Sequence, residues 1–425
     1  MRKHRIAVSL LIAGGLAAPM AHATNGYLPI GYGVKNEGMG GVGIALPQDS
    51  LAAAVNPAGM VMVGDRADVG LTLFRPNRDA TISGNNLGPA GSMNGSYSGN
   101  GRSNFLVPDL GYNKMISADT SLGVSVYGNG GMNTQYNTNP FSPLGGQGAA
   151  GINLEQLFIS PTWSMKVNAN NSIGVALNLV YQMFSAQGLQ PFACPTVALC
   201  GGGPVPSASP SNVTNNGTDT STGVGIRLGW TGQVTPMVTL GATYQPKTTM
   251  SKFGKYSGLF ANGGSFDIPA NYGAGIAVKA TPEITTAFDV EQIQYGGVTS
   301  VGDSPLIAAQ YGSANGPGFG WQNMTVYKLG VAYAYDSNLT LRAGFNHNTQ
   351  QIGTNAAFLN ILAPGVVQNH LTLGSTWKLA DKSELSVAYI HAFSQTVTGP
   401  VNLVPGGGTA SIQMHEDSIG VMYGW

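Results

Sequence analysis

The sequence is poor in charged side chains, which make up 9% of its 425 residues. A soluble globular domain carries about 25%, so the composition disfavours that class. The few charges are balanced, with 19 Lys and Arg against 19 Asp and Glu, and they form no basic patch or basic tail. Proteins that bind nucleic acid usually show such a basic footprint. We therefore expect no nucleic-acid partner.

Long apolar runs are also missing. The best candidate, Ile6–Ala21, is interrupted by two glycines and a proline, whereas a membrane-spanning helix needs about 20 apolar residues. Its basic start and the small residues of Ala21-His22-Ala23 indicate instead a secretory signal peptide over residues 1–23. Removing it takes three basic residues, which leaves 16 against 19 acidic ones.

Cysteine is nearly absent, since Cys194 and Cys200 are the only two. They lie six residues apart in a long segment rich in Pro and Gly, with no histidine nearby. Two thiols alone make a poor zinc site, and an exported chain meets oxidising conditions. A disulfide that shortens this segment is the favoured interpretation, and a functional role is the alternative.

Glycine is abundant, at 62 residues, and apolar residues recur on every second position from Asp65 to Trp425. Val69, Leu71 and Leu73 show this alternation clearly. A period of two predicts strands with one face in an apolar environment, and about fourteen segments follow it. The predicted strands are residues 66–75, 104–115, 120–136, 151–167, 171–187, 218–234, 237–253, 264–280, 283–298, 323–335, 338–353, 365–379, 382–398 and 411–425.

The connections between these strands alternate in length. Tight turns such as Thr235-Pro236 and Asp336-Ser337-Asn338 follow even-numbered strands, and long connections such as 76–103 follow odd-numbered ones. Short periplasmic turns and long outer loops are typical of outer-membrane barrels, which also commonly end on an aromatic strand like Ile419–Trp425. The sequence thus predicts an all-β membrane protein, with an antiparallel transmembrane β-barrel over residues 65–425. A soluble β-sandwich would not need this alternation of loop lengths.

Residues 24–64 do not follow the barrel pattern. They are dense in glycine, and Asp49–Val55 predicts a short helix that Pro57 would stop. The segment is too long for a loose tail and too apolar to stay in solvent. We expect it to fold into the lumen as a plug, and a disordered periplasmic tail is the alternative.

Several motifs resemble a known family. The Gly-rich start followed by Asn56-Pro57-Ala58 is similar to the hatch of the FadL/TodX-type outer-membrane transporters, which take up long-chain fatty acids and hydrocarbons. The resemblance extends to Pro269–Gly273, Phe288–Tyr295, Ile361–Val367 and His370–Gly374. These motifs span nearly the whole mature chain in the family's order, and they say little about the substrate.

The resemblance implies a fourteen-stranded barrel with an N-terminal hatch over residues 24–64. It also implies that apolar substrate passes from an outer groove to a lumenal pocket and leaves sideways through a kinked third strand. In this sequence the third strand loses its alternation at Gly128, Gly130 and Gly131. Glycines can bend a strand and leave it unpaired. We expect the lateral gate there, and an ordinary bulge near the rim is the alternative.

Alternation also places the charged residues and histidines. The charges predicted to face the lumen are Arg227, Asp289, Glu291, Lys328, Arg342 and Glu384. We expect them mainly to brace the barrel and hold the hatch, with Arg227 and Arg342 as alternative contacts of a substrate carboxylate. Of the four histidines on the last strands only His370 faces inward, so we predict no metal site, no catalytic site and no cofactor.

The sequence therefore predicts a transporter of the Gram-negative outer membrane, and not an enzyme, for passive uptake of hydrophobic small molecules. Long-chain fatty acids are the first expectation, and an aromatic-hydrocarbon channel of the same fold is the alternative. A general porin is disfavoured by the plug, and an adhesion barrel acting through its loops remains a further rival. We expect a monomer in contact with outer-membrane lipid, inserted by the barrel-assembly machinery through its C-terminal strand.

Overall fold

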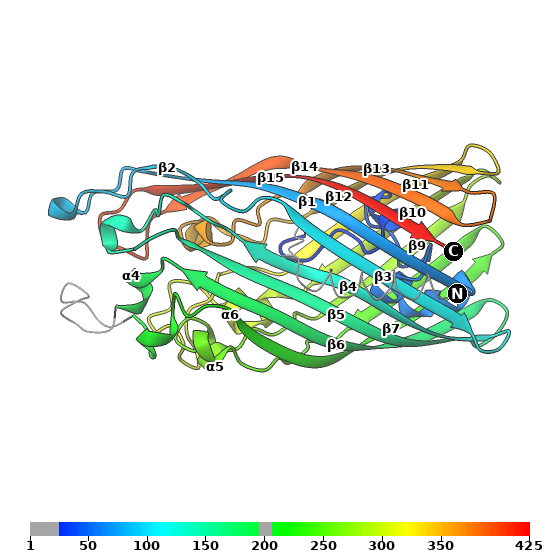
Figure 1. Cartoon of the computed structure of the whole chain (residues 1–425), viewed down its shortest axis with the longest axis horizontal. Helices are drawn as coiled ribbons and strands as arrows, with labels where there is room; N and C mark the ends of the chain where they lie inside the picture. The colour runs from blue at the N-terminus through cyan, green and yellow to red at the C-terminus, as the bar shows by residue number, and fades with distance from the viewer. Residues whose placement is uncertain (1–24, 195–205) are drawn as a thin grey trace.

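A computed structural model describes residues 25–194 and 206–425 (Figure 1). The predicted signal peptide and Cys200 lie outside these residues, while Cys194 is the last described residue before the gap. No helix within the described ranges is long and apolar enough to cross a membrane.

The described residues form one antiparallel sheet of fifteen strands that closes on itself, because β15 pairs with β1. β2 (Gly95–Ser98) pairs only with the outer part of β1, so fourteen of these strands make the wall. The wall strands are β1 (Arg66–Ser83), β3 (Phe105–Met115), β4 (Thr120–Asn133), β5 (Gly151–Lys166), β6 (Asn171–Gln187), β7 (Asp219–Thr235), β8 (Val238–Gln245), β9 (Asn271–Lys279), β10 (Ile284–Ile293), β11 (Met324–Ala334), β12 (Leu339–Asn348), β13 (Asn369–Lys378), β14 (Glu384–Pro400) and β15 (Thr409–Gly424). The predicted fourteen-stranded antiparallel barrel is confirmed.

β6 shows how the alternation builds the wall. Leu177, Leu179 and Tyr181 point outward and are exposed, while Asn178 and Gln182 on the alternate positions are fully buried inside. An apolar outer band with a polar interior is the arrangement that lipid on one side and a lumen on the other require.

The predicted strands depart from the structure at β8, which ends at Gln245 where residue 253 is predicted, and at β1. The sequence predicts an end at residue 75, but β1 continues to Ser83 and stays paired with β15 throughout. Pro76 is tolerated because β3 pairs with β1 only as far as Phe74, so the proline lies where β1 has a free edge. The long connection predicted at 76–103 is correspondingly shorter.

Residues 25–64, here called the N-terminal segment, lie within the barrel and are almost entirely buried (Figure 1). The short helix predicted at 49–55 is present only as the 3₁₀ turn at Ala52–Ala54; Asp49 before it accepts a hydrogen bond from the Leu51 N–H, and Pro57 begins the next turn. Proline suits a first helical turn because its missing N–H is not needed there. The short helices are α2 (Val34–Glu37), α3 (Met60–Val63) and the 3₁₀ turns η1 (Ala52–Ala54) and η2 (Pro57–Gly59).

The long connections fold together at the end of the barrel opposite the C-terminus (Figure 1). Their aromatic rings pack closely, as where the Phe260 and Phe266 centroids lie 5.0 Å apart. They therefore place an apolar cluster over the outer opening. The short helices in these connections are η3 (Gly88–Ala90), η4 (Ser142–Leu144), α4 (Gln190–Ala193), η5 (Pro210–Asn212), η6 (Gly254–Tyr256), α5 (Ala261–Gly264), η7 (Tyr295–Gly297), α6 (Thr299–Gly302), η8 (Thr354–Ala356) and η9 (Leu359–Ile361).

Candidate functional site

The barrel wall is interrupted between β3 and β4. The two strands pair from Met115↔Ser121 to Leu110↔Val126, and the described ladder does not join them beyond that point. Further out, Asn100 bridges to Gln135, which closes the interruption above. We call this opening the wall window; residues 105–109 of β3 and 127–133 of β4 form its two sides.

β4 bends inward at the wall window. Its register with β5 shifts between Gly128 and Gly130, which leaves Asn129 out of the ladder. Gly130 has a φ of +144°, and a Cβ there would lie 1.9 Å from the carbonyl oxygen of Tyr27. The Gly131 N–H donates to that same oxygen at 3.0 Å. Glycine allows such close approach, so Gly130 and Gly131 lie where the strand meets the N-terminal segment, while Gly128 faces Val107 of β3.

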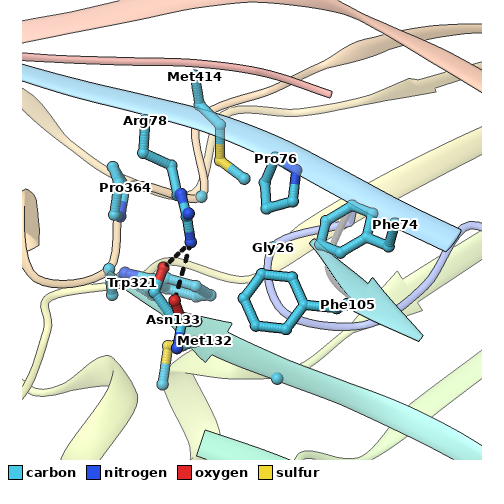
Figure 2. Close-up of a pocket in the computed structure, with 13 residues that line it drawn as sticks. Gly26, Phe74, Pro76, Arg78, Phe105, Met132, Asn133, Trp321, Pro364 and Met414 are labelled. Atoms are coloured by element: carbon cyan, nitrogen blue, oxygen red, sulfur yellow. Dashed lines mark hydrogen bonds between the residues drawn. The ribbon is translucent and has the colours of Figure 1, made fainter. Parts of the chain in front are cut away.

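A cavity, here called the window cavity, lies behind the wall window (Figure 2), and its empty space of about 360 Å³ includes the part that is open to solvent. It is bordered mainly by apolar side chains, namely Phe74, Phe105, Met132, Trp321, Pro364 and Met414. Arg78 also borders it, and its Nη1 donates to the backbone and side-chain oxygens of Asn133. The cavity therefore combines a greasy lining with a buried guanidinium.

Tyr295 holds the start of the N-terminal segment beside this cavity. Its hydroxyl accepts hydrogen bonds from the backbone N–H groups of Tyr27 and Leu28, at 3.2 and 3.3 Å, and donates to the Asn25 carbonyl. The ring of Trp321 lies edge-on against Tyr295, with centroids 5.2 Å apart. The Tyr295 hydroxyl thus holds backbone groups of Asn25, Tyr27 and Leu28 next to the cavity.

A second cavity of similar size, about 360 Å³, lies beneath the outer loops and is bordered by Phe184, Phe260 and Leu362 among others. Leu362 borders this outer cavity, and the next residue, Ala363, borders the window cavity. The residue before Leu362 is tied to the chain beyond β4, because the Tyr136 hydroxyl donates a hydrogen bond to the Ile361 carbonyl at 2.7 Å. The two apolar cavities are therefore neighbours along one short stretch of chain.

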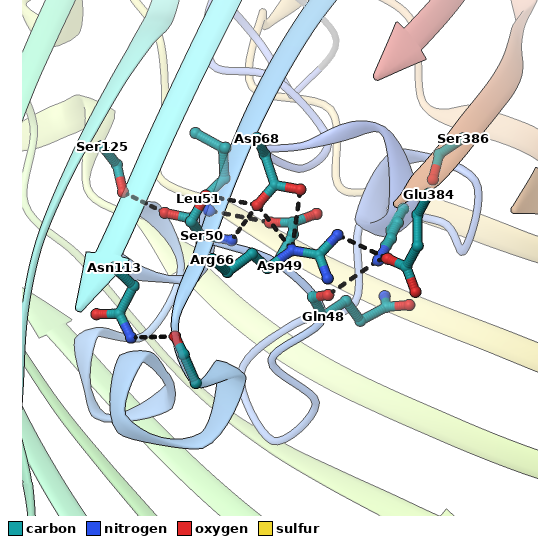
Figure 3. A network of polar contacts seen from close by, with 12 residues as sticks. Gln48, Asp49, Ser50, Leu51, Arg66, Asp68, Asn113, Ser125, Glu384 and Ser386 are labelled. Carbon is teal, nitrogen blue, oxygen red and sulfur yellow. Dashed lines mark hydrogen bonds and ion pairs between the residues drawn. The ribbon is translucent and has the colours of Figure 1, made fainter. Parts of the chain in front are cut away.

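Ion pairs join the N-terminal segment to the periplasmic end of the wall (Figure 3). Glu384 of β14 pairs with Lys35 at 2.5 Å and with Arg66 at 2.7 Å. Arg66 also pairs with Asp68, whose Oδ2 accepts the backbone N–H of Ser50 at 2.9 Å. A polar network of this kind braces the segment and fills the lumen with charged groups.

The two arginines weighed as carboxylate contacts both bind the N-terminal segment. Arg342 donates to the Gln48 side chain at 3.0 Å, and Arg227 donates to the Val55 carbonyl at 3.3 Å. Neither borders the window cavity, although Arg227 borders another cavity, next to Tyr32. These contacts agree with bracing, and a role in substrate binding stays a prediction.

The histidines are placed as the alternation indicates. His370 is fully buried inside, whereas His391 lies on the outer face and pairs with Asp417 at 2.9 Å. The described residues hold no cluster of three side chains suited to a metal ion.

Sequence reasoning missed Arg78, Tyr295 and Trp321. The sequence predicts a loop at Arg78 because the apolar alternation stops at residue 75, although the inward positions of Phe74 and Pro76, continued along β1, lead to Arg78. Tyr295 falls in the predicted strand 283–298, but β10 ends at Ile293, and Trp321 lies in a connection, so alternation gives no orientation for either residue.

Burial raises the pKa of Glu37 in α2 to about 7 and that of Asp49 to about 6, so both carboxyls resist ionisation. A segment released from the wall would ionise them near their ordinary pKa. Between about pH 4.5 and pH 7 the docked state therefore loses stability as the pH rises. We expect Glu37→Gln to reduce the fall in melting temperature between about pH 5 and about pH 8. An unchanged fall in that variant would contradict this assignment.

A protein-family model described as outer membrane protein transport protein (OMPP1/FadL/TodX) matches residues 31–417. The chain belongs to this family. It is accordingly an outer-membrane β-barrel that transports hydrophobic molecules, and not an enzyme. The comparison with curated proteins finds no match.

Solved structures of this family share the fold. The Pseudomonas putida toluene transporter TodX is 19% identical with a TM-score of 0.66, covering 93% of this chain and 98% of its own. The Ralstonia pickettii toluene transporter TbuX is 19% identical with a TM-score of 0.63, covering 92% and 98%. A Pseudomonas aeruginosa FadL homologue is 17% identical with a TM-score of 0.66, covering 96% and 99%. At these identities the likeness concerns the fold alone.

Proposed function

We propose that this protein takes up compact hydrophobic molecules passively, by way of the outer cavity and the window cavity, and releases them sideways through the wall window. The observation that carries the proposal is the break in the β3–β4 ladder directly beside an apolar cavity. Residues 24–64 act in this proposal as the hatch that closes the straight path through the lumen.

The energetics favour a sideways exit over a straight one. Apolar surface gains roughly 25 cal/mol per Å² on leaving water, which draws substrate into the cavities without an energy source. Below the window cavity the lumen is filled by the N-terminal segment and by ion pairs such as Lys35–Glu384. An apolar molecule would lose its gain among these groups, whereas the wall window opens toward lipid.

Monoaromatic compounds are the first candidate substrates. The structures of the toluene transporters TodX and TbuX resemble this chain along nearly its whole length. The window cavity is bordered by the aromatic rings of Phe74, Phe105 and Trp321, which suit contact with a flat apolar ring. Long-chain fatty acids are the second candidate, because the two neighbouring apolar cavities would accommodate an extended chain and a FadL homologue also shares the fold.

Uptake of labelled toluene and labelled oleate by cells that lack their own hydrophobic transporters tests this proposal. We expect the intact chain to raise toluene uptake clearly above the level of cells with an empty vector. Oleate uptake without toluene uptake would move the substrate class to fatty acids. Correctly assembled protein that raises neither would contradict the proposed function.

A further inference from the structure

Arg78 carries its charge into the window cavity without a charged partner. Its side chain is only 1% exposed and points inward from β1 (Figure 2). Its acceptors are neutral: Nη1 donates to the oxygens of Asn133, and Nη2 donates to the backbone carbonyl of Arg102. The Nε–H finds no acceptor among the described residues. A buried guanidinium with an unused donor is costly unless something else binds it.

The inward-facing acid on the neighbouring strand β15 does not supply that partner. Glu416 of β15 also points inward and is 1% exposed, and the register pairs it with Pro76 while Arg78 pairs with Met414. Both of its carboxylate oxygens lack a hydrogen bond within the described chain, where the ion pairs include none between Glu416 and Arg78. The Phe105 ring, 5.9 Å from the guanidinium carbon, offers only a cation–π contact.

We propose that Arg78 binds the acidic head of the transported molecule, so that the window cavity takes aromatic or aliphatic carboxylates in preference to hydrocarbons of the same shape. The guanidinium fork matches a carboxylate, and charge-assisted hydrogen bonds are the stronger kind. The apolar lining would hold the rest of the molecule. This inference rests on the proposed function, because it needs the window cavity to lie on the transport path.

A purely structural role for Arg78 is the rival explanation. Its bonds to Asn133 and Arg102 tie β1 to the end of β4 and to the chain before β3, at the outer edge of the wall window. Loss of that tie would weaken every ligand alike. Loss of a head-group contact would weaken only ligands that have the head group, so a matched pair of ligands separates the two roles.

The test is calorimetric titration of the purified full-length protein in lipid nanodiscs, with 4-hexylbenzoate and the uncharged 4-hexyltoluene as ligands. The intact protein is expected to bind the benzoate more tightly. Arg78→Met should weaken benzoate binding by about tenfold or more and leave hexyltoluene binding unchanged. Arg78→Lys keeps the positive charge but lacks the planar guanidinium, so its affinity for the benzoate should lie between those of the intact protein and Arg78→Met. Heat-modifiable migration on a gel shows that each variant is folded.

Two further variants sharpen the test. Arg75→Met removes a positive charge from the exposed, lipid-facing side of the same strand and should change neither affinity. Glu416→Gln replaces the inward-facing acid of β15 with a neutral group of similar size, and benzoate binding should persist, because the proposed contact does not involve Glu416.

Two results would overturn the inference while leaving the proposed function in place. One is equal affinity of the intact protein for both ligands, and the other is equal weakening of both ligands by Arg78→Met. A folded intact protein that binds neither ligand would instead remove the proposed function, and the inference with it.

Discussion

A disulfide across the wall window is expected to stop uptake when oxidised and to restore it when reduced. Val107 of β3 and Gly128 of β4 face each other there, since a Cβ on Gly128 would lie 3.0 Å from a methyl carbon of Val107. Disulfides need Cβ atoms about 3.5–4.5 Å apart, which a small adjustment provides. In the variant with Val107→Cys and Gly128→Cys, we expect toluene uptake at least about tenfold lower before reduction than after it.

The matched control joins the same two strands where they already pair. Leu110 and Val126 are ladder partners at the inner edge of the wall window. A bond between Leu110→Cys and Val126→Cys adds a covalent link without closing the opening, so uptake should not respond to reductant. Unchanged uptake through the oxidised Val107–Gly128 pair would show that substrate leaves by another route.

Removing residues 26–63 is expected to turn a barrel that conducts almost no ions into an open pore. Barrels of about eight strands are filled by their own side chains, while those of about sixteen leave an aqueous channel. With fourteen strands, this wall depends on the N-terminal segment to fill it. Planar-bilayer recordings should show little current for the intact chain and large steady currents for the deletion.

A deletion elsewhere provides the comparison. Gly88–Gly91 form an exposed outer loop around η3, and their removal should leave the conductance of the intact chain unchanged. Large steady currents from the intact chain would favour a general porin. A silent but folded barrel lacking 26–63 would show that something other than this segment closes the lumen.

The strands of the wall could be predicted because their signal is local. Apolar residues two positions apart, such as Leu177 and Leu179, indicate directly which side chains face lipid. The outer part of β1 gave no such signal, since Asn77 and Asp79 occupy its outward positions. Pro76 and its polar neighbours therefore have the composition of a loop, and only their pairing with β15 identifies them as part of a strand.

The candidate site could be predicted only where one strand carries it. The glycines of β4 interrupt a local pattern, and they lie where β4 meets the N-terminal segment. The window cavity instead gathers Phe74, Trp321 and Pro364 from three distant parts of the chain. No spacing in the sequence indicates that these residues meet, because their proximity arises from closure of the whole barrel.

The wall window is framed by paired backbone on every side, with Leu110↔Val126 below, Asn100↔Gln135 above, and β1 and β5 behind its edges. A molecule that crosses it breaks no strand pair. The groups that must move are side chains such as Val107 and Met132, and rotation of a side chain is a far faster event than rearrangement of a sheet. The hydrogen bonds between the strands therefore stay intact during each crossing. Substrate can pass through the wall while the circumference of the barrel stays constant.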